Sequence, residues 1–196
     1  MMAHGAPLGS WVPCGRMALG ARNVRPSIDE VDAMDSETFV ASLGSAVEHS
    51  PWVALEAWRR RPFGSVAALQ LAFEAAVRGA PRERRLELLR AHPELAGREA
   101  AAGELTGASA REQRAARLDR LAADELAALT ALNAEYAARF GFPFIVCVRE
   151  HSVESLLAWG RARLTRDPDA EAATALAEVG KILGLRLREL VGEQYR

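Results

Sequence analysis

Apolar residues recur every three or four positions along most of the chain from Ser36 onward, which is the spacing of one buried helix face. The clearest runs are Val66, Leu69, Phe73 and Val77; Leu126, Leu129, Leu132 and Tyr136; and Leu176, Val179, Ile182, Leu183 and Leu187. Candidate helix boundaries are the N-caps Ser36 and Ser65, the opening residues Pro51, Pro81, Ser152 and Asp169, and the stop Gly141. We therefore predict an all-α fold, a compact single-domain bundle of about seven to eight helices.

Residues 142–148 interrupt this helical period. Their sequence is Phe-Pro-Phe-Ile-Val-Cys-Val, which is apolar and partly β-branched, and Gly141 and Arg149 bound it. No second segment resembles a partner strand, so we predict one short extended segment between helices. Because its backbone N–H and C=O groups must find other partners, it is a candidate for main-chain recognition of a small ligand.

The first 27 residues differ in composition from the rest. They contain four glycines, three prolines and three arginines, and no acidic residue precedes Asp29. Serines are scarce and no amphipathic period appears, which disfavours a transit peptide. We expect residues 1–27 to form a disordered N-terminal extension and residues 28–196 to form the helical domain.

Charge and composition exclude several classes of protein. Lys and Arg number 25 against 26 Asp and Glu, for a net charge of −1, which does not favour a nucleic-acid partner. No apolar run approaches the roughly 18 residues of a membrane span. Two cysteines, Cys14 and Cys147, provide no disulfide framework, and no metal-ligand motif is present. We expect a cytoplasmic protein with no metal, no nucleic acid and no membrane partner.

His92 lies directly before Pro93, where helical backbone is disfavoured. We therefore expect one helix to end at His92 and Pro93 to start another, leaving the imidazole free to point away from the packed surface. Taken alone, a structural role for one histidine is the favoured interpretation. Ser109 and Glu112 have the Ser-x-x-Glu spacing of a capping box, and such a helix start is also a place where an anionic substrate binds.

Arg186 and Arg188 lie two positions apart on the last predicted helix and therefore face different directions. We expect Arg186 to reach inward to a carboxylate and Arg188 to be solvated. Lys181 is the only lysine, so a Schiff-base mechanism has one candidate residue. It lies in an Ile/Leu/Val-rich helix and is expected to face outward, which disfavours a lysine-dependent lyase.

These motifs occur in an order that resembles the 2-oxo-4-hydroxy-4-carboxy-5-ureidoimidazoline (OHCU) decarboxylases. The motifs are His92-Pro93-Glu94-Leu95-Ala96-Gly97, Ser109-x-x-Glu112-Gln113, Leu132-Asn133-x-x-Tyr136 and Arg139-Phe140-Gly141-Phe142-Pro143-Phe144. Ser50-Pro51-Trp52-Val53 and Arg61-Pro62-Phe63 also fit, and the resemblance covers about residues 36–192. Glu94 stands where many members have aspartate, which is a conservative difference.

The resemblance implies a carboxy-lyase that makes (S)-allantoin from OHCU in urate (purine) catabolism, with an all-helical fold, no cofactor and a homodimeric state. It implies His92 as the catalytic histidine, acting as general acid/base near its ordinary pKa, and Glu112 as its acidic partner. The substrate-binding residues that it implies are Pro93, Ser109, Gln113, the main chain of Phe144, Ile145, Val146, Cys147 and Val148, and Arg186. The alternative is a catalytically inactive helical binding or assembly protein; the presence of His92, Glu112 and Gln113 in their motifs favours the enzyme.

Overall fold

The computed structural model describes residues 25–192, and within this range every regular element is helical. The α-helices are α1 (Ile28–Ala33), α2 (Ser36–Leu43), α3 (Pro51–Trp58), α4 (Val66–Gly79), α5 (Arg82–Arg90), α6 (Arg98–Ala102), α7 (Gly107–Ala115), α8 (Ala123–Phe140), α9 (Val153–Arg163) and α10 (Pro168–Leu190). Short 3-10 turns are η1 (Gly44–Ala46), η2 (Leu118–Arg120) and η3 (Val148–Glu150). Two of the α-helices, α1 and α6, have only six and five residues. The predicted all-α class is confirmed.

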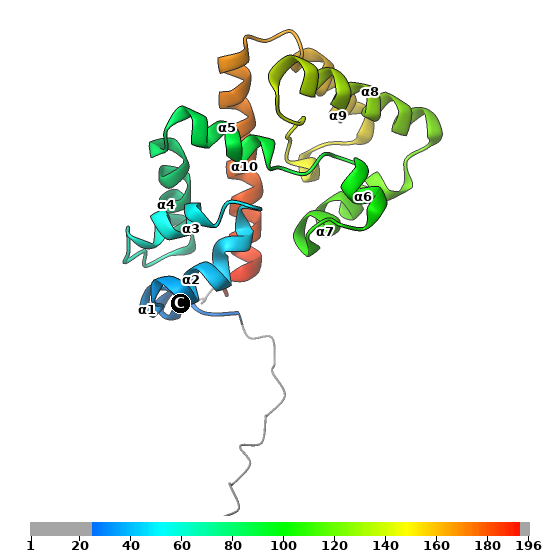
Figure 1. Ribbon diagram of the computed structural model, residues 1–196. Coiled ribbons are helices and arrows are strands. Elements are labelled where there is room, and N and C mark those ends of the chain that lie inside the picture. The colour runs from blue at the N-terminus through cyan, green and yellow to red at the C-terminus, as the bar shows by residue number, and fades with distance from the viewer. Residues whose placement is uncertain (1–24, 193–196) are drawn as a thin grey trace, which may run out of the picture.

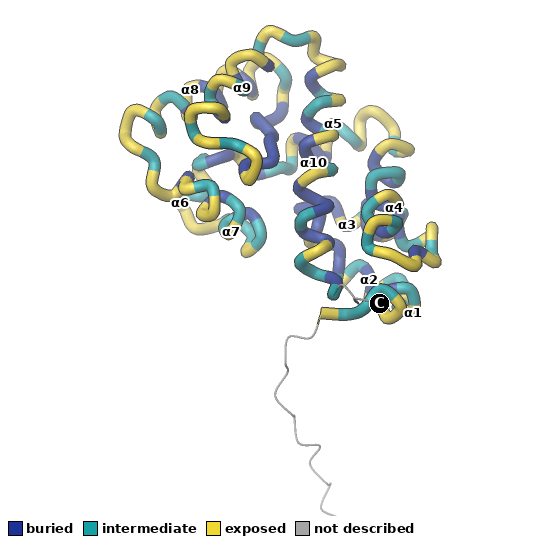
Figure 2. The backbone as a smooth tube through the Cα atoms, turned by 180° about the vertical axis from the view of Figure 1, so that it is seen from behind, coloured by how far each residue is buried: buried dark blue, intermediate teal, exposed yellow. Residues whose placement is uncertain are grey.

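The long helix α10 runs through the middle of the molecule (Figure 1). Helices α1 to α5 lie on one side of it and α6 to α9 on the other, an arrangement that Figure 2 shows from behind. The predicted apolar face of α10 is buried at Val179, Ile182, Leu183 and Leu187. Because α10 contacts α2, α4, α5 and α8, its burial joins the two groups of helices into one core. No helix in the described range has the length and apolarity needed to cross a membrane.

Several predicted helix ends are confirmed. Ser65 is the N-cap of α4, and Gly141 ends α8 with a positive φ of 73°. Ser152, predicted to start a helix, is the N-cap of α9, which begins one residue later at Val153. The prediction for α2 was wrong by one residue, because the Asp35 carboxylate accepts the Thr38 N–H at 2.7 Å and so replaces Ser36 as the cap. Two other starts are corrected likewise: Pro81 precedes α5 as its N-cap residue, and α10 starts at Pro168 after the cap Asp167, ahead of Asp169.

The non-helical segment that contains His92 is longer than predicted. Helix α5 ends at Arg90 and the next helix starts at Arg98, so Pro93 does not start a helix. Side chains replace the missing helical hydrogen bonds: Gln113 accepts the Ala96 N–H at 2.8 Å, and Asn133 donates to the Leu95 carbonyl at 2.9 Å. These long-range bonds hold the segment that carries His92.

The predicted extended segment is confirmed, and two buried charged side chains bind its backbone. Arg163 of α9 donates to the Ile145 carbonyl at 2.8 Å, and Glu178 of α10 accepts the Cys147 N–H at 2.8 Å. Arg163 also pairs with Glu171, and both side chains are fully buried. The segment, dark in Figure 2, is therefore fixed from two helices at once.

The N-terminal end of the described chain belongs to the folded part. The Ser27 hydroxyl accepts the Glu30 N–H, and the Glu30 carboxylate accepts the Ser27 N–H at 2.7 Å, which makes a capping box at α1. The Pro26 carbonyl accepts the Gly192 N–H at 2.9 Å. The predicted boundary between residues 27 and 28 thus falls inside this cap, and the expectation of disorder over residues 1–24 lies outside the described residues.

Candidate active site

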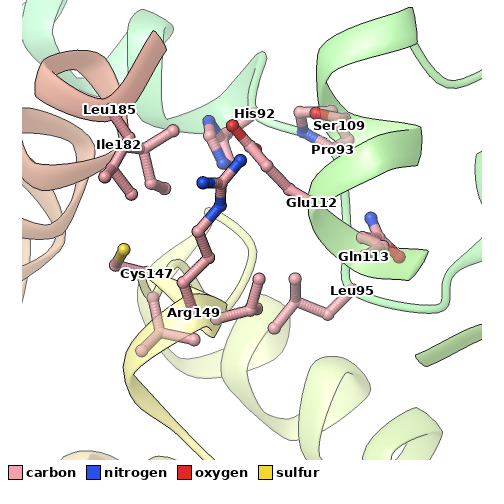
Figure 3. A pocket seen from close by; sticks show the side chains of 12 residues that line it. His92, Pro93, Leu95, Ser109, Glu112, Gln113, Cys147, Arg149, Ile182 and Leu185 are labelled. Atoms are coloured by element: carbon pink, nitrogen blue, oxygen red, sulfur yellow. The ribbon is translucent and has the colours of Figure 1, made fainter. Parts of the chain in front are cut away.

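Four separated segments meet around a narrow cavity beside α10 (Figure 3). They are the loop after α5, helix α7, the extended segment with η3, and the middle of α10. The lining residues are His92, Pro93, Leu95, Ser109, Glu112, Gln113, Val146, Cys147, Val148, Arg149, Ile182 and Leu185.

Most of the predicted site residues meet in this cavity, and three do not line it. Phe144 is buried in the core with its ring 5.2 Å from that of Tyr136, and Ile145 is buried with its carbonyl bound to Arg163. Arg186 lines a neighbouring groove instead of the cavity. Of the extended segment, residues 146–148 reach the cavity, while the two residues before them anchor it.

The predicted capping box at Ser109 was wrong. Helix α7 starts at Gly107, and its N-cap is Thr106, whose hydroxyl accepts the Ser109 N–H at 3.3 Å. Ser109 and Glu112 therefore lie inside the helix, one turn apart, and their side chains are available to the site. With Thr106 as the cap, both of these polar groups are free for long-range partners.

Arg186 of α10 binds two polar side chains of α7, Glu112 and Ser109. Its Nε and Nη2 atoms donate to the two carboxylate oxygens of Glu112 at 2.8 and 2.7 Å, and Nη2 also donates to the Ser109 hydroxyl at 3.1 Å. Arg186 is 3% exposed, whereas Arg188 is exposed, so their predicted orientations are confirmed. The paired contact to Glu112 is the bidentate geometry that a planar guanidinium favours. That Arg186 also touches substrate stays a prediction.

A second carboxylate, Glu48, was missed by the sequence analysis. Glu48 is 5% exposed and lies 3.1 Å from Arg186 Nη1. Its carboxylate accepts a hydrogen bond from the Thr106 hydroxyl and another from the Ser109 hydroxyl, the latter at 2.6 Å. Burial alone would raise the pKa of Glu48, but the Arg186 charge and these hydrogen bonds lower it below its ordinary value. Glu48 is therefore a carboxylate at neutral pH. Its one sequence signal, a lone acid beside apolar Ala46 and Val47, is too common to identify a site.

The imidazole of His92 is neutral in this environment. Burial, reinforced by the Arg186 charge and opposed in part by Glu48, lowers the pKa of His92 from 6.5 to about 4. The expectation of a nearly ordinary pKa was wrong, because the sequence could not show the burial of the ring or the nearby charge of Arg186. A neutral imidazole at pH 7 accepts protons and hydrogen bonds, and the Glu112 carboxylate binds Arg186 rather than this ring.

Arg149 also enters the cavity and was not predicted. It follows the extended segment in η3, and its guanidinium points toward Glu112 and His92 (Figure 3). Its side chain is 38% exposed and binds Glu189 at 2.5 Å. Arginines are frequent in this chain, so its position after an apolar run was not a distinctive signal.

The described residues contain no group of three or more His, Cys, Asp and Glu side chains placed to hold a metal ion. The cavity is lined by the neutral imidazole of His92, the Glu112 carboxylate and the Arg149 guanidinium, and Arg186 joins Glu112 to the buried carboxylate of Glu48, which does not line it. These groups can bind a small polar anion and move protons.

Comparison with known proteins identifies the family. Residues 32–188 match the sequence model of the OHCU decarboxylases. The chain belongs to the OHCU decarboxylase family. The family assignment covers the described part of the chain almost from end to end, and it confirms the resemblance drawn from the ordered motifs.

Individual relatives agree with this family. The chain is similar to the 2-oxo-4-hydroxy-4-carboxy-5-ureidoimidazoline decarboxylase of Haloferax volcanii, with 41% identity over 83% of this chain and 95% of that protein. The protein of the same name from Bos taurus is 42% identical over 85% of this chain and 98% of its own. The crystal structure of an (S)-allantoin synthase has a TM-score of 0.65 and 27% identity, and covers 84% of this chain and 54% of that one. The predicted carboxy-lyase class is thereby confirmed for this family member.

Proposed function

We propose that this protein converts OHCU to (S)-allantoin in urate (purine) catabolism, with side chains alone and no cofactor. The observation that carries the proposal is the meeting of His92, Glu112, Ser109 and Gln113 in one cavity, from segments that the sequence separates. Membership of the OHCU decarboxylase family supports the substrate.

The reaction needs little from a cofactor because the substrate can hold the electrons itself. The bond from the ring carbon to the carboxylate breaks, CO₂ leaves, and the electron pair enters the conjugated imidazoline system. One proton then adds to carbon on one face of the ring, so each turnover consumes one proton and releases one CO₂. The protein must orient the carboxylate for departure and direct that proton.

Each polar group of the cavity has a proposed role. The neutral imidazole of His92 contacts the hydroxyl and carboxylate region of OHCU as a proton acceptor, and returns the proton as an acid. Glu112, fixed by Arg186, orients the substrate hydroxyl or helps to deliver the proton. Pro93, Ser109 and Gln113 bind the ring, and the main chain of residues 146–148 faces the ring or ureido amides. Arg186 reaches substrate oxygens or acts through Glu112.

The test uses purified protein and freshly generated OHCU. Substrate loss and the optical activity of the product are followed together, because OHCU also decays without catalyst. Rapid loss with optically active (S)-allantoin is expected. Loss at the uncatalysed rate with racemic product, from a folded sample, would favour the inactive binding or assembly protein instead.

We also propose that the protein is a cytoplasmic homodimer, as the family resemblance implies. Light scattering should give twice the chain mass of 21.2 kDa. A monomer mass at micromolar concentration would contradict the dimer.

A further inference from the structure

Arg149 lines the cavity and Arg186 lines the neighbouring groove, and their charges are balanced to different extents. Arg186 contacts two carboxylates, Glu112 at 2.7 Å and Glu48 at 3.1 Å, so this group of three carries one excess negative charge. Arg149 and Arg111 share a single carboxylate, Glu189, at 2.5 and 3.6 Å, so that group carries one excess positive charge. The cavity therefore lies between a negative and a positive cluster.

The two arginines also differ in access. Arg186 is almost completely buried and lines the groove behind α7, whereas Arg149 lines the cavity and is partly exposed. To bind an entering anion, Arg186 would have to release Glu112 or Glu48 and leave a buried carboxylate without its partner, which is strongly unfavourable. Arg149 can release Glu189 to bind the anion at a lower cost, because Glu189 is partly exposed and keeps Arg111.

We propose that Arg149 binds the departing carboxylate of the substrate and selects for ligands that carry it. The inference rests on the proposed decarboxylation. The planar guanidinium suits a carboxylate, and its position beside residues 146–148 places the bound anion at one wall of the cavity. The substrate hydroxyl and ring N–H groups then face His92 and Glu112, toward which the Arg149 guanidinium points.

This arrangement distinguishes substrate from product. When CO₂ leaves, the anion that Arg149 binds disappears, and allantoin is left with the contacts to the rest of the cavity. Because the contact binds the ground state and the transition state alike and is lost only once CO₂ has left, it contributes to substrate affinity and not to acceleration of the chemical step. Removal of the Arg149 guanidinium should therefore raise KM selectively.

The test compares Arg149→Met with the matched variant Arg111→Met. Both remove one positive charge that contacts Glu189, but Arg111 lines the neighbouring groove and not the cavity. We expect Arg149→Met to raise the KM for OHCU roughly 10- to 100-fold, with kcat and the Kd of (S)-allantoin within about threefold of wild type. Arg111→Met should leave all three values within about twofold. Arg149→Lys should be intermediate, because it keeps the charge and loses the fork.

The outcomes separate this inference from the proposed function. If the wild-type protein turns over OHCU and Arg149→Met has an unchanged KM, the inference is overturned and the proposed function stands. Equal loss of affinity for OHCU and (S)-allantoin would show that Arg149 only shapes the cavity, and would also overturn it. An equal rise in KM for Arg149→Met and Arg111→Met would show that the effect comes from long-range charge and not from contact with the carboxylate, and would overturn the inference. A wild-type protein that does not accelerate OHCU loss would overturn both proposals.

Discussion

His92 and Arg186 interact electrostatically, and they have opposite protonation states at neutral pH. Arg186 stays charged because Glu112 and Glu48 bind it, and contact with these carboxylates raises its pKa despite burial. That positive charge and burial keep His92 neutral. Besides burial, the charge state of the imidazole thus depends on Arg186 of α10 and on Glu48 in the turn after η1, both far from it in sequence.

Replacement of His92 by alanine tests the catalytic role. The variant should fold, because the position is only partly buried and its backbone contacts remain, and its rate should fall roughly 10²- to 10⁴-fold. Circular dichroism checks the fold, and initial rates with fresh OHCU measure the loss. Near-normal turnover by the folded variant would remove His92 from the mechanism.

The same residue should make stability depend on pH. The pKa of His92 is 6.5 ordinarily and about 4 in the fold, so below pH 6.5 the unfolded chain takes up this proton more readily. The free energy of unfolding therefore has its full value, as far as His92 is concerned, above pH 6.5. It decreases as the pH falls from 6.5 toward 4. Between pH 7.5 and 5, wild type should lose about 1–2 kcal/mol more unfolding free energy than His92→Gln. Urea titrations at both values measure this, and parallel losses in the two proteins would contradict it.

At the level of elements, α8 and α9 approach closely at Gly160 beside the extended segment. A Cβ at this position would lie 2.4 Å from a methyl of Leu132 and 3.2 Å from the ring of Phe144. Both neighbours are buried, so they have little room to move. The packing of two helices thereby sets the position of the segment that ends in the cavity.

Gly160→Ala should therefore destabilise the protein by about 1–3 kcal/mol through overpacking. It should also lower activity, because a shift of Phe144 displaces residues 146–148. Gly79→Ala is the control, since a Cβ there meets nothing within 4 Å and should be neutral or stabilise by up to about 1 kcal/mol. Thermal unfolding and OHCU turnover compare the two, and equal melting temperatures would show that the helices can separate without cost.

Local patterns predicted the long helices well because burial of one face is the main force that forms them. The period across Val179, Ile182 and Leu187 is an example, and all three are buried on α10. The Ser-x-x-Glu pattern at Ser109 failed because Thr106, three residues earlier, is an equally suitable cap. Glu48 and Arg149 escaped prediction because their importance comes from contacts to Arg186 and Glu189, which no local spacing encodes.

For the whole molecule, α10 connects the two groups of helices, and the site lies where they meet. Arg186 on α10 binds Glu48 from one group and Glu112 from the other. The site is therefore complete only when both groups pack against the same helix. Ordered motifs in the sequence predicted much of the cavity wall, but not this junction between the two groups.

The N-terminal boundary of the fold can be tested by two chains that begin at different residues. A chain beginning at Ile28 lacks the Ser27 cap and the Pro26 carbonyl that binds Gly192, whereas one beginning at Arg25 keeps both. The shorter chain should be less stable by about 1 kcal/mol, the usual cost of losing an N-cap. Differential scanning calorimetry measures the difference, and identical unfolding curves would show that this cap contributes nothing.

The hydrogen bond between Pro26 and Gly192 nearly closes the described chain into a ring. A short peptide linker could join those two positions, and the polypeptide could then be opened elsewhere without changing which residues face one another. The cavity would still form, because its walls are brought together by contacts between segments and not by their order along the chain. The order in which the segments follow one another along the backbone is thus separable from the chemistry that they assemble, and a circularly permuted gene is a direct way to separate them.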